Sequence, residues 1–258
     1  MDWLVEQQLR YEQVFLLVAA RLAGLCWAAP VFGSIAVPVR VRMLLVLMLG
    51  LILTPGEAAR AQLAETLPAF LLQATREGLV GFALGLGVSL VLLAAAVGGQ
   101  AISQLGGLRL GEDLHEELGA SLPAGARLLH LTALAVFLAI GGHELVMAGL
   151  LESFTVLPAG TAVVDRSLVE AVAALIMQSL SLGVRIAVPG CAALVTALMA
   201  LGLLGRAVPQ LGAMQLGFGP TSVVAIISLA VAAGSLSWLI GDHLTPSLMT
   251  VLNSSTGG

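Results

Sequence analysis

The sequence predicts an all-α membrane protein, a polytopic bundle of long, kinked helical hairpins. Of the 258 residues, 59% are hydrophobic and only 10% are charged, and the mean hydropathy is +1.03. A soluble domain usually carries about 25% charged residues and about 45–50% apolar ones. The apolar residues form long runs instead of alternating segments of about ten residues, which excludes a transmembrane β-barrel.

Six apolar blocks define the expected helices, within a single domain that covers residues 1–258. The blocks span about 14–31, 41–55, 67–98, 128–151, 168–204 and 221–241. A helix needs about 20 residues to cross the hydrocarbon core of a bilayer, so the second block is short for a span. The third and fifth blocks are long enough to bend, to tilt strongly or to fold back.

Pro189 and Gly190 stand in the middle of the fifth block. Proline removes an amide hydrogen and glycine relaxes the backbone, so this pair predicts a broken helix or a tight hairpin. Polar connections are expected at 56–66, 99–127, 152–167 and 205–220. The arginines are balanced between the two sides of a six-span arrangement, so they assign no orientation in the membrane.

The composition argues against several classes of partner and site. The net charge of −4 comes without a run of like charges, so neither nucleic acid nor anionic lipid is expected as the main partner. Cys26 and Cys191 lie in apolar segments and are expected to be small buried hydrophobic side chains. No cofactor or metal site is expected, and the chain is not expected to be an enzyme.

The charged or titratable side chains within the apolar blocks include Arg21, His143, Glu144 and Arg185. A charge costs about 2.5–3.5 kcal/mol at the centre of a membrane helix, so it normally faces protein or water. Each of the four either pairs with a carboxylate or free helix carbonyls inside the bundle, or marks a functional pathway. His143 and Glu144 form the adjacent pair among them that could exchange protons, because arginine keeps its proton at ordinary pH.

Gly81 and Gly85 form a GxxxG pattern that is flanked by Gly78 and Gly87. Small residues at this spacing let helices approach closely in lipid, so the pattern indicates a helix–helix contact within or between subunits. Glycine is also common in membrane helices without such a role, and the sequence alone leaves both interpretations open.

Five short stretches carry a combination of motifs that one protein family shares. In order along the chain, the matching residues are Arg21, Gly24, Pro30, Phe32, Gly33, Pro38, Arg40, Arg42, Gly99, Gln100, Ile102, Gln104, Gly106, Gly142, His143, Ser153, Phe154, Pro158, Gly160, Arg206, Pro209, Gln210, Gly217 and Phe218. Together, from about residue 14 to 240, they resemble the FliR family. Its members are flagellar biosynthesis subunits of the bacterial type III export gate, and the virulence-secretion counterpart is a close alternative.

The resemblance implies a fold like a fusion of a FliP-like and a FliQ-like subunit. One copy would complete a protein-conducting channel with subunits of these two types, in the bacterial inner membrane at the flagellar basal body. Unfolded flagellar proteins would leave the cell through it, and FlhB- and FlhA-type export components are the further partners implied. The residues expected to be structural or to contact other subunits are Arg21, Pro30, Phe32, Gly33, Pro38, Arg40, Arg42, His143, Arg185, Pro189, Arg206, Pro209 and Gln210.

Two local expectations come from the same resemblance. The first is that Pro30 and Pro38 turn the chain into a hairpin, with Arg21 paired to a carboxylate or to helix carbonyls of its own fold or of a neighbour. The second is that the glycine-rich segment 99–117 is a loop that helps to plug the closed channel. The residues assigned to this plug are Gly99, Gln100, Gln104, Gly106 and Gly107.

The chain departs from the family pattern at three places. Gly212 stands where an asparagine is expected, Gly219 is inserted before Pro220, and an acidic GEDLHEELG stretch replaces an Asp-Pro pair. These changes leave the details of the closing loop and of the C-terminal turn open.

Two alternatives belong to other classes of function. A proton-coupled secondary transporter would use His143 and Glu144 as a proton site and the break at Pro189 as a substrate site, but its inverted repeats are not found. An intramembrane protease is disfavoured because Met147 replaces the second histidine of a zinc-binding HExxH motif. Ser121 likewise has no clear partner for a serine-protease mechanism.

Overall fold

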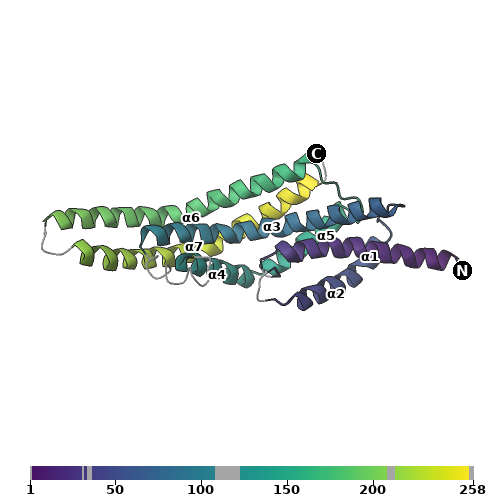
Figure 1. The fold of residues 1–258 in the computed structure, drawn as a ribbon, viewed down its shortest axis with the longest axis horizontal. Coiled ribbons are helices and arrows are strands. Elements are labelled where there is room, and N and C mark those ends of the chain that lie inside the picture. Colours follow the sequence, from purple (N-terminus) through teal and green to yellow (C-terminus); the bar gives the residue numbers. More distant parts are fainter. Residues whose placement is uncertain (1, 31, 34–36, 108–122, 208–212, 256–258) are drawn as a thin grey trace. The chain divides into compact units, whose positions relative to one another are not determined.

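The fold is described by a computed structural model that covers residues 2–30, 32–33, 37–107, 123–207 and 213–255. Within these residues the chain forms seven helices and no strand (Figure 1), so the predicted all-α fold is confirmed. The helices are α1 (Asp2–Ala28), α2 (Val39–Glu57), α3 (Leu67–Leu105), α4 (Ala124–Ala139), α5 (Gly142–Val156), α6 (Arg166–Ala207) and α7 (Ala213–Ser255).

The lengths of these helices agree with a polytopic membrane protein. In the part of the chain that the structure describes, four helices are long and apolar enough to cross a membrane. The number rises to six when α4 with α5, and the two parts of α7, are each counted as one bent span. α3, α6 and α7 contain 39, 42 and 43 residues, about twice the 20 that one span requires.

The chain divides into two compact units, and each is described by itself. The first unit comprises Met1–Leu90, Gly141–Ile176 and His243–Gly258, and the second comprises Val91–Ile140 and Met177–Asp242. α3, α6 and α7 each contribute residues to both units.

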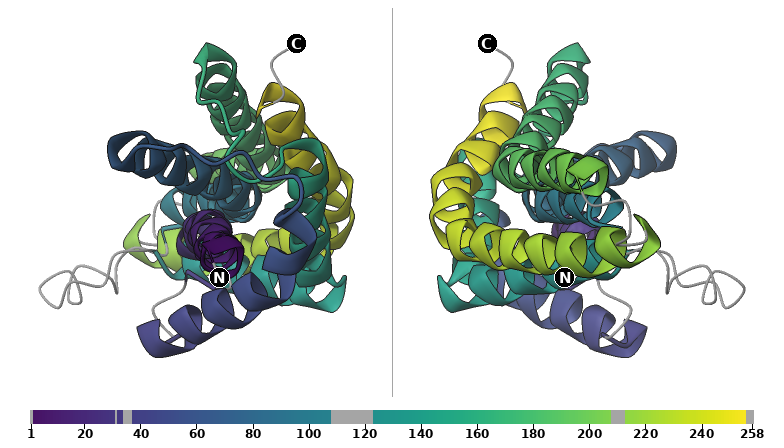
Figure 2. Two further views of the ribbon diagram at one scale, coloured as in Figure 1. Left: turned by 90° about the vertical axis from the view of Figure 1, so that its right-hand side faces the viewer. Right: turned by 90° about the vertical axis from the view of Figure 1, so that its left-hand side faces the viewer.

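In the first unit, α1 and α2 form the hairpin that Pro30 and Pro38 predict (Figures 1 and 2). α1 ends at Ala28, and the amide of Gly33 donates to the Ala29 carbonyl at 2.6 Å. Pro38 stands directly before α2, where its fixed φ and missing amide hydrogen suit the start of a helix. The turn is therefore built from the residues that the sequence singled out for it.

Small residues bring α1 and α3 of the first unit into backbone contact. A Cβ added at Gly81 would overlap the Arg21 carbonyl, and one added at Gly85 would lie 2.8 Å from the Leu25 carbonyl oxygen. Gly24 of α1 meets the backbone of α3 in the same way. The GxxxG pattern therefore marks a contact inside this chain, because only glycine allows the two backbones to come so close.

α3 makes similarly close contacts in the second unit. A Cβ added at Gly99 would overlap the carbonyl of Gly125 in α4, and one added at Gly98 would lie 2.7 Å from Ile186 of α6. These glycines lie inside a continuous helix, where glycine is unfavourable by about 1 kcal/mol relative to alanine. Close packing against neighbouring helices offsets this loss of helix stability.

The predicted break at Pro189 and Gly190 is wrong, because α6 runs through both residues as one helix. Proline removes a single backbone donor, and packing on neighbouring helices can hold the turn that loses it. A Cβ added at Gly190 would lie 2.8 Å from Ile102 of α3 and 3.2 Å from Ser228 of α7. The glycine therefore serves a close helix contact and not a fold-back of the chain.

Three other predicted boundaries also change. The apolar block at 128–151 is divided after Ile140, where Gly141 has a φ of +75°, in the left-handed region that favours glycine. The connection expected at 99–127 begins later, because α3 continues to Leu105. The connection expected at 205–220 is shorter, because α6 ends at Ala207 and α7 begins at Ala213.

A substitution at the contact between α1 and α3 tests the role of its glycines. We expect Gly81→Ala to lower the free energy of unfolding by about 1–3 kcal/mol, because the new methyl group would overlap the Arg21 carbonyl. The control is Gly234→Ala in α7, where nothing lies within 4 Å of an added Cβ. Denaturant unfolding of the full chain in detergent micelles, followed by circular dichroism, measures both. Equal stability of the two variants would contradict the contact.

Candidate functional site

The candidate site surrounds Arg21, whose side chain is completely buried in α1 at 0% exposure. Its Nε donates to Oε2 of Glu77 in α3 at 2.6 Å, and its Nη2 lies 2.5 Å from the same oxygen. The Glu77 side chain is also 0% exposed. A buried charge is tolerated when it has a counter-charge and hydrogen bonds. Arg21 and Glu77 meet both conditions for each other.

α5 completes the surroundings of the Arg21 guanidinium. Nη1 donates to Oγ of Ser153 at 3.2 Å, and the guanidinium carbon lies 4.1 Å from the centre of the Phe154 ring. Ser153 in turn donates its hydroxyl hydrogen to the Leu150 carbonyl at 2.6 Å, which leaves the oxygen free to accept from Arg21. The aromatic face adds a cation–π attraction of about 2 kcal/mol when the cation is desolvated.

The second carboxylate oxygen of Glu77 holds the loop that follows α5. Oε1 accepts a hydrogen bond from the Gly160 amide at 2.8 Å. Gly160 has a φ of +87°, and a Cβ added there would overlap the Gln62 carbonyl. The Gln62 amide donates to the Ala159 carbonyl at 3.0 Å. One buried carboxylate therefore connects α1, α3 and this loop.

Two more polar side chains tie the loop after α5 to the loop after α2. Nε2 of Gln73 donates to the Gly160 carbonyl at 3.1 Å, and its Oε1 accepts from the Ala64 amide at 3.1 Å. Oε2 of Glu57, at the end of α2, accepts from the Ala159 amide at 3.4 Å. Both loops are thus held by side chains from helices and not only by their own turns.

This buried cluster, formed by Arg21, Glu57, Glu77, Ser153 and Phe154, holds segments together. It contains one fixed cation and two carboxylates, and backbone amides of the loop after α5 donate to both carboxylates. Arginine does not act as a proton carrier at ordinary pH. Among the residues that the structure describes, no group of three or more His, Cys, Asp or Glu side chains is placed to hold a metal ion.

Several motif residues from distant parts of the sequence meet in this cluster. Arg21 comes from the first stretch and Ser153 and Phe154 come from the fourth, and the amide of Gly160, also from the fourth, donates to Glu77 of the cluster. The sequence separation between Arg21 and Ser153 is 132 residues. The resemblance named these residues separately, and the structure brings them together.

Other residues expected at the site lie elsewhere. Pro30, Phe32 and Gly33 form the half-buried turn after α1, and Arg42 is half-buried near the start of α2. The exposed residues are Pro38, Arg40, His143, Arg185 and Pro189. Arg206 belongs to the last turn of α6, while Pro209 and Gln210 lie outside the described residues.

The expected plug loop begins later than predicted. Gly99, Gln100 and Gln104 belong to helix α3 and not to a loop, because close packing favours a helix where glycine alone suggested a mobile segment. Gly106 and Gly107 follow the end of α3, and Gly107 has a φ of +69°. Residues 108–117 of the proposed plug lie outside the described residues.

Glu77, the partner of Arg21, was not among the site residues predicted from the sequence. A signal for it was present, because Glu77 is the only acidic residue in the apolar block at 67–98. Glu77, Gly81, Gly85 and Ser89 also follow one another at intervals of four, which places them on one face of a helix. The hydroxyl of Ser89 donates to the Ala28 carbonyl of α1. Glu77 is therefore the first residue of the row on α3 that packs against α1.

Comparisons with known proteins give the same relationship along nearly the whole chain. The family of bacterial export proteins, family 1, matches residues 13–246. The flagellar biosynthetic protein FliR of Caulobacter vibrioides is 28% identical over 225 residues, which cover 87% of this chain and 88% of that protein. The protein of the same name from Escherichia coli is 28% identical over 251 residues, 96% of this chain and 94% of that one.

A more distant relative shows the same extent of similarity. The flagellar biosynthetic protein FliR of Bacillus subtilis is 25% identical over 244 residues, which cover 93% of each chain. The resemblance drawn from five short motifs is thereby confirmed.

Removing one partner of the buried pair tests its contribution to stability. We expect Glu77→Gln to lower the free energy of unfolding by about 3–5 kcal/mol, because the charge of Arg21 would remain buried without its counter-charge. The double variant Arg21→Met with Glu77→Gln should recover part of this loss. Denaturant unfolding in detergent micelles measures the free energy of unfolding of the single and the double variant.

The matched control is Arg166→Met. Arg166 pairs with Glu170 at 2.9 Å, but the two side chains are 88% and 65% exposed, so its removal should change stability little. A loss from Glu77→Gln no larger than that from Arg166→Met would contradict the role given to the buried pair.

Proposed function

Since this chain belongs to family 1 of the bacterial export proteins, we propose that it is a subunit of the flagellar type III protein export gate. It completes a protein-conducting channel with FliP-type and FliQ-type subunits, and unfolded flagellar proteins pass through that channel. FlhB- and FlhA-type components are its further partners. The proposed location is the bacterial inner membrane, at the flagellar basal body.

The observation that carries this proposal is the family match over residues 13–246. The buried cluster supports it, because motif residues far apart in the sequence depend on one another for their polar contacts there. The single-domain organisation over residues 1–258 is part of the proposal. The flagellar role, as opposed to virulence secretion, is supported by the similar proteins, which are flagellar biosynthetic proteins.

The distribution of buried and exposed apolar surface supports a subunit that needs neighbours. Of the 18-residue apolar stretch that qualifies each helix as a candidate span, 67% is buried within the chain in α3, against 11% in α2 and 22% in α6. α2 exposes large side chains along its length, such as Met43, Leu47 and Ile52. Apolar faces of this kind suit lipid or other membrane subunits.

The transporter alternative loses the features on which it depended. Its substrate site required a break at Pro189, and α6 is continuous there. Its proton site required His143 and Glu144, which are exposed in the first turn of α5. Neither residue belongs to the buried cluster.

Assembly with the expected partners tests the proposed function. We expect this chain, expressed with the FliP-type and FliQ-type proteins of its own genome, to purify in detergent as one discrete mixed complex. Native mass spectrometry should find one copy of the chain in it. A chain that purifies alone, or only with itself, would overturn the proposal.

A variant of the buried cluster supplies the internal comparison for that experiment. Arg21→Leu should insert into the membrane but give a lower yield of the mixed complex, because the segments joined by the cluster lose their common anchor. Arg166→Leu removes an exposed arginine and should leave the yield unchanged.

The segment that follows α3 remains a proposal for the channel plug. Deleting residues 107–117 should make the assembled channel leak ions, and conductance across a planar bilayer measures this. A variant with a Gly-Ser linker of equal length separates removal of the plug from shortening of the loop. Unchanged conductance in both would mean that the segment is only a connector.

A further inference from the structure

The first turn of α4 lies in a tight notch on α3 in the second unit. The notch is formed by Gly99 and Ser103 of α3, and a Cβ added at Gly125 of α4 would overlap Oγ of Ser103 and lie 3.1 Å from the Gly99 carbonyl oxygen. A Cβ added at Gly99 would in turn overlap the Gly125 carbonyl. Because only glycine leaves room at both positions, the two helices meet here through backbone atoms and one hydroxyl group.

The hydroxyl group of Ser103 has no hydrogen-bond partner among the residues that the structure describes, although Ser103 is 0% exposed. Serine and threonine side chains in helices commonly donate to a carbonyl three or four residues earlier, as Thr132 of α4 does to Leu128 at 2.8 Å. The Ser103 hydroxyl instead lies against Gly125 of the neighbouring helix. A buried hydroxyl without a partner is unfavourable, so this position of α4 on α3 carries a free-energy cost.

α4 itself carries a second polar atom of this kind. Nδ1 of His130 is buried, and within the described part of the chain it has no hydrogen-bond partner. The buried face of α4 is formed by small and apolar residues, namely Gly125, Ala126, Leu129, Ala133 and Phe137. Since nearly all buried polar atoms in folded proteins have a partner, two such atoms at one short helix require a common explanation.

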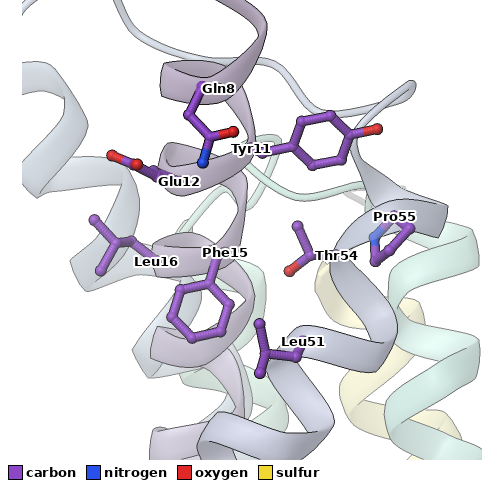
Figure 3. A pocket seen from close by; sticks show the side chains of 8 residues that line it. All are labelled: Gln8, Tyr11, Glu12, Phe15, Leu16, Leu51, Thr54 and Pro55. Carbon is purple, nitrogen blue, oxygen red and sulfur yellow. The ribbon is translucent and has the colours of Figure 1, made fainter. Parts of the chain in front are cut away.

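The contact at Ser103 is too close for a bridging molecule to supply the missing partner. A water molecule needs about 10–15 Å³ of free space, and the hydroxyl and Gly125 already lie closer together than one added methyl group requires. The groove between α1 and α2 in the first unit shows the contrast, because Tyr11, Phe15 and Thr54 line an open space of about 520 Å³ there (Figure 3). The Ser103 hydroxyl therefore gains a partner only when the contact between α3 and α4 changes.

α4 is the shortest helix of the second unit and is packed from one side. It has 16 residues, whereas α3, α6 and α7 have 39, 42 and 43. Its outer face exposes Leu128, Leu131 and Leu138. Gly141, which follows α4, has a φ of +75°, and glycine absorbs changes in backbone angles without steric cost. A displacement of α4 therefore breaks fewer contacts than a displacement of one of the longer helices.

We propose that α4 has two positions on α3 and that Ser103 changes its hydrogen bonding between them. In the seated position, which the structure shows, Gly125 lies against both the Ser103 hydroxyl and the Gly99 carbonyl. In the displaced position α4 has left the notch, and the hydroxyl donates to the Gly99 carbonyl, four residues earlier in its own helix. The hydrogen bond gained in the displaced position offsets part of the packing lost there, which keeps both positions accessible.

The link between this movement and export rests on the proposed function. In the export channel, the displaced position of α4 belongs to the conducting state and the seated position to the closed state. The movement itself requires only the contacts within the second unit, so it is tested separately on the chain alone.

Electron paramagnetic resonance of two spin labels on the full chain in detergent micelles tests the movement. The labels are attached at Leu105 of α3 and Leu131 of α4, which are both exposed, after Cys26 and Cys191 have been replaced by alanine. We expect two label distances in this chain. Ser103→Ala should lower the displaced population about tenfold relative to the seated one, because the hydrogen bond gained on displacement is lost.

Gly125→Ala should have the opposite effect and make the displaced position dominant, because the added methyl group overlaps Oγ of Ser103. Adding Ser103→Gly to this variant removes the overlap and should restore the seated distance. The control is Gly202→Ala in α6, where nothing lies within 4 Å of an added Cβ, and it should leave both populations unchanged. One and the same distance in the labelled chain and in Gly125→Ala would overturn the proposal, and so would a displaced population that Ser103→Ala leaves unchanged or raises.

Conductance of the assembled complex across a planar bilayer tests the link to the channel. We expect Ser103→Ala to lower the conductance and Gly125→Ala to raise it, each by up to about tenfold, following the population of the displaced position. Unchanged conductance in both variants, with two label distances present, would overturn the assignment of the displaced position to the conducting state. Failure of the complex to form would count against the proposed function, and the label distances would still decide whether α4 moves.

Discussion

The rest of the first unit depends on the ion pair between Arg21 and Glu77, because both charges are completely buried. A buried arginine without a counter-charge is strongly destabilising, so α1 and α3 can pack in only one register. Glycines in the same row of α3 allow the backbones to meet closely enough for the pair to form. The second oxygen of Glu77 then fixes the position of Gly160. A single carboxylate thus determines the placement of two helices and one loop.

The same use of glycine recurs in both units. Apolar burial contributes little to helix association inside a membrane, because lipid tails are as apolar as leucine. Close contact between backbones is one of the interactions that remain. Gly81 in the first unit and Gly99 in the second each lie against the backbone of another helix at a distance that no larger residue allows, and Gly190 lies close to Ile102 of α3. Hydrogen bonds between helices, such as the one from Arg21 to Ser153, add a directional interaction to this backbone packing.

A fold organised in this way has consequences for assembly. Its interior holds large apolar side chains, small residues and a few polar contacts, and further large apolar side chains lie on the outside, most clearly along α2. Exposed apolar side chains of this kind suit contact with lipid or with other membrane-embedded chains.

The sequence by itself determined the all-α membrane fold, the approximate extent of its apolar blocks and the hairpin at Pro30 and Pro38. The first two follow from composition and from local backbone chemistry, and the hairpin was implied by the family resemblance. Only the tertiary structure decided that Glu77 is the partner of Arg21, that α6 continues through Pro189, and that Gly99 belongs to a helix. The Arg21–Glu77 pair joins residues 56 positions apart. α6 at Pro189 and α3 at Gly99 are held in helical form by packing against other parts of the chain. Local patterns do not encode which distant segment supplies a counter-charge or a packing surface.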